Sequence, residues 1–202
     1  RLPRLQQRFP DIQLRLVAED SSVPLHEGDF DLAIDLNDGS YPGLLSTALL
    51  DEQIFPVCAP SLLRGRPPLH GPADLVHFPV LHDITAWRGS YEYAEWEFYL
   101  NAIGFEGADV RRGHTFNRNH LTIEAAIAGM GVAIARRTLL NDELERGTLI
   151  VPFGLPIANH KRYVLLYPAG ALAHPSARAV HDWLVEEAGI FRSLHPLNEQ
   201  QM

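Results

Sequence analysis

Short apolar stretches with two different spacings alternate along this chain, and this alternation restricts the fold more than any other feature of the sequence. Residues 12–18 and 29–36 place an apolar side chain at every second position, as a strand with one solvated face does. Residues 92–104 and 174–189 repeat apolar side chains every three or four positions, as an amphipathic helix does. Strands that alternate with helices predict an α/β fold, in which helices cover both faces of parallel sheets.

The remaining segments continue this alternation. A first helix over residues 1–9 is expected to stop at Pro10, and the C-terminal helix is expected to begin at Pro175 and end at Gly189. Another helix is expected to follow Asn117 or Asn119 and to end at Gly129. Further strands are expected within 44–60 and at 79–83, 109–116, 132–135, 149–153 and 163–168, and further helices at 61–63 and 137–147.

A Pro/Gly-rich stretch, residues 64–75, is interpreted as a linker that leads to a short helix, either capped near Asp74 or begun at Pro72. The change of pattern after the linker predicts two lobes. The C-terminal helix can pack only on a lobe whose strands already exist, so the chain is expected to cross over and return. Residues 1–58 and 168–202 would then form lobe I, and residues 59–167 lobe II.

Charge and composition exclude several classes of function. The formal net charge of −8 opposes binding to DNA phosphates, so this chain is expected to bind DNA poorly by itself. Its single cysteine, Cys58, cannot form an internal disulfide and has no CxxC partner, which favours a buried role in a cytoplasmic protein. Ten histidines show no metal-ligand spacing, and no apolar run is long enough to span a membrane. We expect no metal, no cofactor and no membrane contact.

Polar side chains cluster where the strand 109–116 gives way to the next helix. Thr115, Phe116 and Asn117 lead into this helix together with Arg118 and Asn119. Ligands of open α/β sheets bind beyond the carboxyl ends of strands, where helix N-termini attract anions. A plain helix cap would explain one of the asparagines equally well, so a capped surface helix stays open as the alternative.

A second polar cluster follows the strand 79–83. His82 and Asp83 end that strand, and Trp87 lies in the loop after it, so polar and aromatic groups are expected to converge there. Neighbouring residues of a strand point to opposite faces, which argues against His82 and Asp83 as a base and its orienting partner. The chain has no GxSxG nucleophile motif and no phosphate-binding glycine loop, so we expect it not to be an enzyme.

Several longer stretches resemble one known family over nearly all of residues 1–189. They are RLPRLQQRFPDIQLRL, DFDLAID, YPGLLSTALLDEQIFPVCAPSLL, PADLVHFPVLHD, EAAIAGMGVAIARRTLLNDELERGTLIVPF and HDWLVEEA. Together they are similar to the effector-binding domain of LysR-type transcriptional regulators, in the branch of the glycine-cleavage and D-serine deaminase activators. The resemblance implies two Rossmann-like lobes joined by crossover strands, like a type 2 periplasmic binding protein, with a small effector between them.

The resemblance also implies which residues and partners take part. The effector would contact Asp35 and Asn37 of lobe I, Tyr163 of the returning strand, and His82, Asp83, Trp87, Thr115, Phe116 and Asn117 of lobe II. An acidic wall and a helix N-terminus suit a small zwitterion, so an amino acid, D-serine-like at first guess, is the expected effector. A winged helix-turn-helix domain, expected to precede Arg1, would bind promoter DNA. The whole protein would form a homodimer or homotetramer, with RNA polymerase as a further partner.

Two other classes compete with this interpretation. A periplasmic solute-binding protein of a transporter would share the fold and every residue of the binding site. A signal peptide upstream would favour it, whereas a winged helix-turn-helix upstream would exclude it. An enzyme built on the same scaffold is the third class, and no motif in the sequence supports it.

Overall fold

The computed structural model describes residues 1–18, 30–37, 41–87, 89–140 and 142–195 of the chain. The helices and strands are α1 (Leu2–Arg8), β1 (Ala33–Asn37), β2 (Leu44–Val57), β3 (Val80–Asp83), α2 (Ala94–Ala102), β4 (Gly113–Phe116), α3 (Asn119–Ile127), β5 (Val132–Arg136), β6 (Ile157–Pro168) and α4 (Pro175–Leu194). Short 3-10 helices are η1 (Pro60–Leu63), η2 (Pro72–His77), η3 (Arg137–Leu139) and η4 (Ala171–Ala173). The strand order is β1-β6-β2-β5-β3-β4.

The chain divides into two compact units. Unit 1 contains residues 1–51 and 160–202, and unit 2 contains residues 52–159. Both boundaries fall inside long strands, β2 and β6, rather than at the expected positions after residues 58 and 167. The Pro/Gly-rich stretch 64–75 is not a linker between lobes, because it lies wholly inside unit 2. Continuous strands, not loops, carry the chain from one unit to the other.

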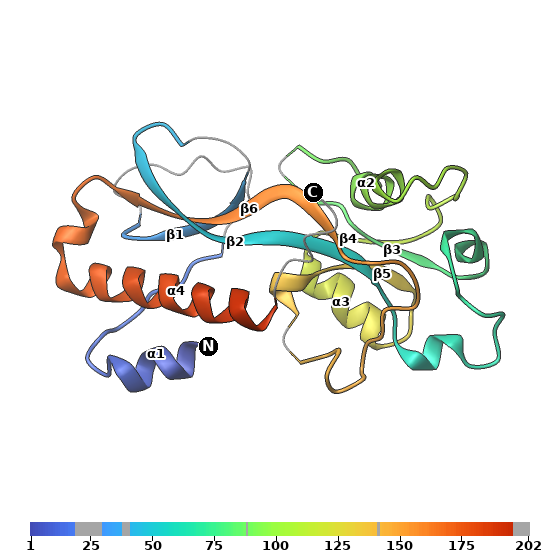
Figure 1. The fold of residues 1–202 in the computed structure, drawn as a ribbon, viewed down its shortest axis with the longest axis horizontal. Helices are drawn as coiled ribbons and strands as arrows, with labels where there is room; N and C mark the ends of the chain where they lie inside the picture. The colour runs from blue at the N-terminus through green and yellow to red at the C-terminus, as the bar shows by residue number, and fades with distance from the viewer. Residues whose placement is uncertain (19–29, 38–40, 88, 141, 196–202) are drawn as a thin grey trace. The chain divides into compact units, whose positions relative to one another are not determined.

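In unit 1, β1 and β6 form an antiparallel pair, and α4 packs against one face of it (Figure 1). The core there consists of Leu49, Leu165 and Ala188, with half-buried apolar residues around them. Helix α1 is joined to α4 by an ion pair, in which the Arg4 guanidinium lies 2.7 Å from the buried Glu187 carboxylate. This ion pair fixes the first helix of the chain against the last.

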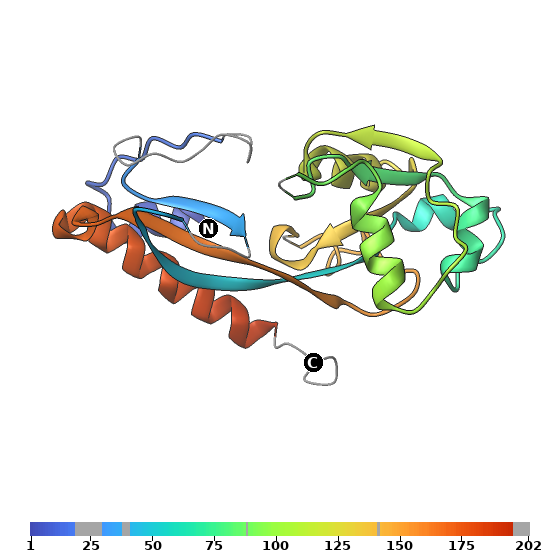
Figure 2. The ribbon, with the colours of Figure 1, turned by 90° about the horizontal axis from the view of Figure 1, so that it is seen from above.

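In unit 2, β3 pairs in parallel with both β4 and β5, and β5 pairs antiparallel with the second half of β2. Helix α2 packs on one face of these strands, against Val80, Val132 and Ile134. Helix α3 packs on the other face, against Leu81 and Ala133 (Figures 1 and 2). Alternate residues of each strand therefore face different helices, as the two-residue period requires.

Two glycines close the turn from α3 to β5 as expected. Gly129 has φ of +76°, and the backbone N–H groups of Gly129 and Met130 donate to the carbonyls of Ala126 and Ala125, both at 3.0 Å. This is a Schellman motif. At Gly131 a Cβ atom would lie 2.5 Å from the Pro79 carbonyl oxygen, so only glycine allows the close approach of β5 to β3.

The expected strand 12–18 is wrong. Its residues pair with no strand among the described residues, and Leu14, Leu16 and Val17 stay largely exposed. Alternating side chains suit a strand, but a strand exists only where a neighbour takes up its backbone hydrogen bonds.

Four further expectations are corrected by the structure. Residues 137–147 do not form a helix but η3 followed by turns. In one of these turns the Arg146 N–H donates to the Asp142 carbonyl at 2.8 Å. The stretch 149–153 contributes only one bridge, between Cys58 and Ile150. Helix α4 continues past Gly189 to Leu194, because burial of Ala188 and Phe191 outweighs the cost of glycine inside a helix. The sheet is also mixed rather than parallel.

Other expectations are confirmed. Helices α1 and α2 and strands β3 and β5 lie where the sequence pattern predicts them, and Pro175 stands in the first turn of α4. Cys58 is fully buried, and burial raises the pKa of its thiol to about 11. A thiol with such a pKa stays protonated and unreactive at neutral pH.

Candidate functional site

Three parallel strands of unit 2 end at the same edge, which we call the carboxyl edge. It consists of residues 83–87, from the last residue of β3 onward, residues 115–119, from the last two residues of β4 onward, and Arg136 at the end of β5. Backbone pairing holds the first two parts together, since the Ile84 N–H donates to the Phe116 carbonyl at 2.8 Å. The edge of an open sheet where parallel strands end is the place where such folds bind ligands.

Asp83 is the most tightly held acidic side chain of this edge. Its exposed fraction is 3%. Its Oδ1 accepts hydrogen bonds from the Thr85 backbone N–H at 2.9 Å and from the Thr85 hydroxyl at 3.0 Å. The same hydroxyl also lies 3.0 Å from the Asn117 carbonyl oxygen, in position to donate to it. Thr85 therefore links the end of β3 to the entrance of α3.

Arg136 and Glu95 belong to this edge, although sequence reasoning missed both. The Arg136 guanidinium donates to Glu95 Oε1 through Nε at 3.2 Å and through Nη2 at 3.1 Å. Nη2 also donates to the Ala86 carbonyl and lies 3.8 Å from Asp83 Oδ2. The position of Arg136 directly after the apolar strand VAIA was the one signal that could have revealed it.

His82 lies on the face of β3 that α2 covers, whereas Asp83 points to the other face, as neighbours on a strand do. The His82 ring is 2% exposed and packs edge-on against Tyr93, with ring centres 5.1 Å apart. Neither ring nitrogen has a hydrogen bond of ordinary geometry to a described residue. Burial lowers the pKa of His82, while the nearby backbone of Val110 and the charge of Glu92 oppose this. The ring is therefore neutral at neutral pH.

The entrance to α3 is not capped in the expected way. Neither Asn117 nor Asn119 is the N-cap, because that position is Arg118, which makes no side-chain cap hydrogen bond. Asn117 is exposed and contributes its carbonyl to the Thr85 link. The buried Nδ2 of Asn119 has no hydrogen-bond partner among the described residues. Simple capping therefore does not explain the asparagines.

The other predicted residues of unit 2 have mixed surroundings. Thr115 is exposed and pairs with His82, while the half-buried Phe116 packs against the core on the α3 face. Trp87 is half-buried and packs edge-on against Phe98, with ring centres 5.5 Å apart. Its indole Nε1 is buried and has no acceptor within the described part of the chain.

The predicted residues of unit 1 do not all share one face. Asp35 pairs with Val164, whereas Tyr163 pairs with Leu36, one position further along β1. Because side chains alternate along a strand, Asp35 and Tyr163 lie on opposite faces. Asp35 is half-buried and accepts hydrogen bonds from the Tyr41 hydroxyl and the Leu36 N–H. Asn37 ends β1.

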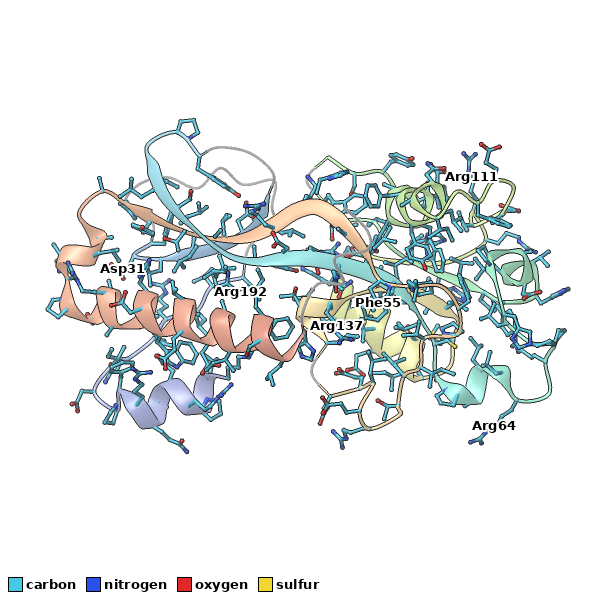
Figure 3. All side chains as sticks on the ribbon, viewed as in Figure 1. Asp31, Phe55, Arg64, Arg111, Arg137 and Arg192 are labelled. Atoms are coloured by element: carbon cyan, nitrogen blue, oxygen red, sulfur yellow. The ribbon has the colours of Figure 1, made fainter. Side chains whose placement is uncertain are left out.

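A groove of about 590 Å³ lies elsewhere in unit 2, at the C-terminal end of α2. Glu97, Glu106, Asp109 and Arg111 supply its charged side chains. Figure 3 shows Arg111 at this end of the unit. None of the predicted binding residues lines this groove, so it is distinct from the carboxyl edge. Among the described residues, no group of three or more His, Cys, Asp or Glu side chains could hold a metal ion.

Comparisons with known proteins give one consistent answer. The model of the LysR substrate binding domain family matches residues 1–189. The glycine cleavage system transcriptional activator of Escherichia coli strain K12 is 30% identical over 188 residues, which cover 93% of this chain and 59% of that protein. The HTH-type transcriptional regulator DsdC of the same strain is 30% identical over 181 residues, 89% of this chain and 58% of the regulator. This chain thus spans just under three fifths of either relative.

A solved structure agrees with these sequence matches. The effector domain of the transcriptional regulator AmpR of Pseudomonas aeruginosa has a TM-score of 0.74 and 26% sequence identity to this chain. The match covers 94% of this chain and 87% of that domain. None of the described helices is both long and apolar enough to cross a membrane.

Proposed function

We propose, from the premise that this chain belongs to the LysR substrate binding domain family, that it is the ligand-sensing domain of a transcriptional regulator. Its ligand would be a small amino acid, bound at the carboxyl edge of unit 2. The observation that carries this proposal is the buried Asp83 carboxylate, which Thr85 holds in a fixed orientation where three parallel strands end.

An amino acid at neutral pH carries one ammonium and one carboxylate group, and the carboxyl edge suits both. The Asp83 carboxylate would accept hydrogen bonds from the ammonium group, as charge-assisted pairs are among the stronger hydrogen bonds in proteins. The first turn of α3, at Asn119, would receive the carboxylate, because backbone N–H groups at a helix start attract anions. Every α-amino acid places these two groups at the same distance, so the size of the amino acid is left to the titration of a ligand panel.

The predicted residues of unit 1 form a second set. Asp35 and Asn37 of β1 and Tyr163 of the returning strand β6 are also proposed as ligand contacts. Asp35 and Tyr163 point to opposite faces, so a small ligand contacts at most one of these two side chains. Each is therefore to be tested by its own variant.

The whole regulator is proposed to bind promoter DNA through a winged helix-turn-helix domain and to act as a homodimer or homotetramer in the cytoplasm. The names of the relatives support this over a solute-binding protein of a transporter, since they are transcriptional regulators. They support a non-enzymatic role for the same reason. A ligand controls DNA binding only if it binds two conformations of the domain with different affinity. Contact with RNA polymerase is a further proposed interaction.

Calorimetric titration with a panel of ligands tests the proposal directly. The panel would contain glycine, L- and D-serine, larger amino acids, aromatic acids and sugars, each added to the purified chain. We expect heat from one or more small amino acids and none from sugars. Heat from aromatic acids or sugars alone, with none from any amino acid, would contradict the proposal.

A further inference from the structure

Arg136 connects three parts of the carboxyl edge through one buried guanidinium group. The side chain comes from β5, holds Glu95 of α2 and the Ala86 carbonyl, and lies 3.8 Å from the Asp83 carboxylate at the end of β3. Its exposed fraction is 6%. The turn that contains Thr85 and Trp87 is thus attached to β5 and α2 by a single charged group.

Two carboxyl groups lie beside this one guanidinium, and both are buried. Glu95 of α2 and Asp83 of β3 lie beside Arg136, and Glu52 of β2 is close enough to act on Glu95 through its charge. One positive charge cannot balance two negative charges, and an unbalanced charge is costly to bury. Charge balance therefore favours a proton on at least one of these carboxyl groups.

The donors that hold the three carboxyl groups differ. Asp83 Oδ1 accepts two hydrogen bonds from Thr85, and Glu52 Oε1 accepts them from the Gln53 N–H and the Thr138 hydroxyl. Glu95 instead depends on Arg136 for both of its hydrogen bonds. Burial is the largest cause that raises the pKa of Glu95, Arg136 lowers it, and the charges of Asp83 and Glu52 raise it, so that the pKa is about 7.

We propose that Arg136 is a positioning residue of the carboxyl edge, and that a proton taken up or released by Glu95 sets how firmly Arg136 is held away from Asp83. When Glu95 is ionised, its charge holds the guanidinium against α2. When Glu95 is protonated, Arg136 keeps the Ala86 carbonyl and turns its charge towards Asp83. The proton on Glu95 thereby changes the charge that the carboxyl edge presents.

The sign of the effect on a ligand follows from these charges, and it rests on the proposed function. Ionised Glu95 adds negative charge near Asp83 and keeps Arg136 from competing for the Asp83 carboxylate. A ligand whose ammonium group binds Asp83 therefore binds more tightly above pH 7 than below it. We expect the Kd to be about tenfold lower at pH 8 than at pH 6, which is the size of effect that a modest change in a charge interaction produces.

The first test needs no ligand. In the isotopically labelled chain, NMR would follow the Glu95 carboxyl carbon, Arg136 Nε–H and Trp87 Nε1–H from pH 5 to pH 9. We expect all three signals to shift together with a midpoint near 7, and the two N–H signals to lose this midpoint in Glu95→Gln. The matched control Glu97→Gln, on the same helix but beside the exposed Arg111, should keep it. Constant Arg136 and Trp87 signals between pH 6 and 8, or a midpoint that survives Glu95→Gln, would overturn the proposal.

The second test measures the affinity for glycine and D-serine at pH 6 and pH 8. The tenfold change expected in the unaltered chain should fall below twofold in Glu95→Gln and persist in Glu97→Gln. Equal affinity at both pH values in the unaltered chain overturns the role of Glu95 while leaving the proposed function intact. Absence of binding by any amino acid contradicts the proposed function instead, and the first test still decides the role of Glu95.

Discussion

Asp35 in unit 1 and Asp83 in unit 2 look alike in sequence, because each stands at or near the end of an apolar strand. Their surroundings differ. Asp35 is half-buried and held by the Tyr41 hydroxyl and the Leu36 N–H. Asp83 is buried beside Arg136 and held twice by Thr85. The comparison shows that the environment of a strand-end carboxylate is set by residues distant in sequence.

This difference has an energetic consequence. Arg136 and the carboxyl groups around it are buried, so water does not solvate their charges. The Asp83 region is therefore stable only if these charges compensate one another. The Asp35 carboxylate is half exposed and can be solvated in part. We therefore expect the Asp83 region to respond strongly to loss of one charge and the Asp35 region to respond weakly.

The largest expected effect is that of Arg136→Met. Removal of the guanidinium leaves Asp83 and Glu95 buried without their cation. We expect the free energy of unfolding to fall by about 3–5 kcal/mol, as it does when one partner of a buried ion pair is removed. Urea unfolding followed by tryptophan fluorescence would measure it. The control is Arg137→Met, since Arg137 lies over the Phe55 ring at 5.9 Å (Figure 3) and should cost about 1 kcal/mol or less. Equal losses in the two variants would contradict the charge-balance account.

The second effect is on the pH dependence of stability. The pKa of Glu95 in the folded chain, about 7, lies above the ordinary value of 4.5, so the folded chain keeps a proton that the unfolded chain releases. This contribution to stability is complete below pH 4.5 and is lost as pH rises to 7. It amounts to about 3 kcal/mol over that window. Urea unfolding at several pH values should show this decline in the unaltered chain and a flatter profile in Glu95→Gln.

These two residues also show where sequence reasoning stopped. Arg136 is followed by Arg137, and such a pair looks like a solvated helix start. Glu95 and Glu97 flank Trp96 in the sequence, so Glu95 looks like one of two surface carboxylates. Strand ends were predictable because apolar runs give way to polar residues at Asp83. The pairing of Arg136 with Glu95 was not predictable, because the guanidinium from β5 contacts α2 only in the folded chain.

The same limit explains the failures in the fold. The strand expected at 12–18 has the right alternation, but strand formation depends on a neighbour that the pattern does not encode. The long strands β2 and β6 were predicted only in part, because their polar residues, such as Asp51 and His160, interrupt the apolar pattern. Helices α2 and α3 were easier to predict, since the hydrogen bonds of a helix are local.

The third prediction compares Asp83 and Asp35 by the effect of each carboxylate on the affinity for the ligand. With the amino acid that gives the largest heat, Asp83→Asn is expected to weaken the affinity by about tenfold or more, as loss of a charged hydrogen-bond partner does. Asp35→Asn should have a smaller effect, because water and Tyr41 share that carboxylate. Calorimetry on both variants measures the two changes. A larger loss from Asp35→Asn would reverse the assignment of the ammonium group to unit 2.

The smallest expected effect is that of Asn117→Ala. The Thr85 link uses the backbone carbonyl of Asn117, so the fold should keep its stability to within about 0.5 kcal/mol. The affinity for the amino acid should nevertheless fall by a few-fold, through loss of an exposed amide at the entrance of α3. Unfolding and calorimetric experiments on the same sample separate the two. Unchanged affinity would leave Asn117 with only its backbone role.

The central claim is that a small amino acid binds at the carboxyl edge of unit 2, and amide chemical-shift mapping tests it most directly. Addition of the amino acid that gives the largest heat to the ¹⁵N-labelled chain should shift the amides of Asp83, Thr85 and Asn119 most among unit 2 residues. Largest shifts at Glu106 and Asp109, in the groove at the end of α2, with none at the carboxyl edge, would contradict the claim.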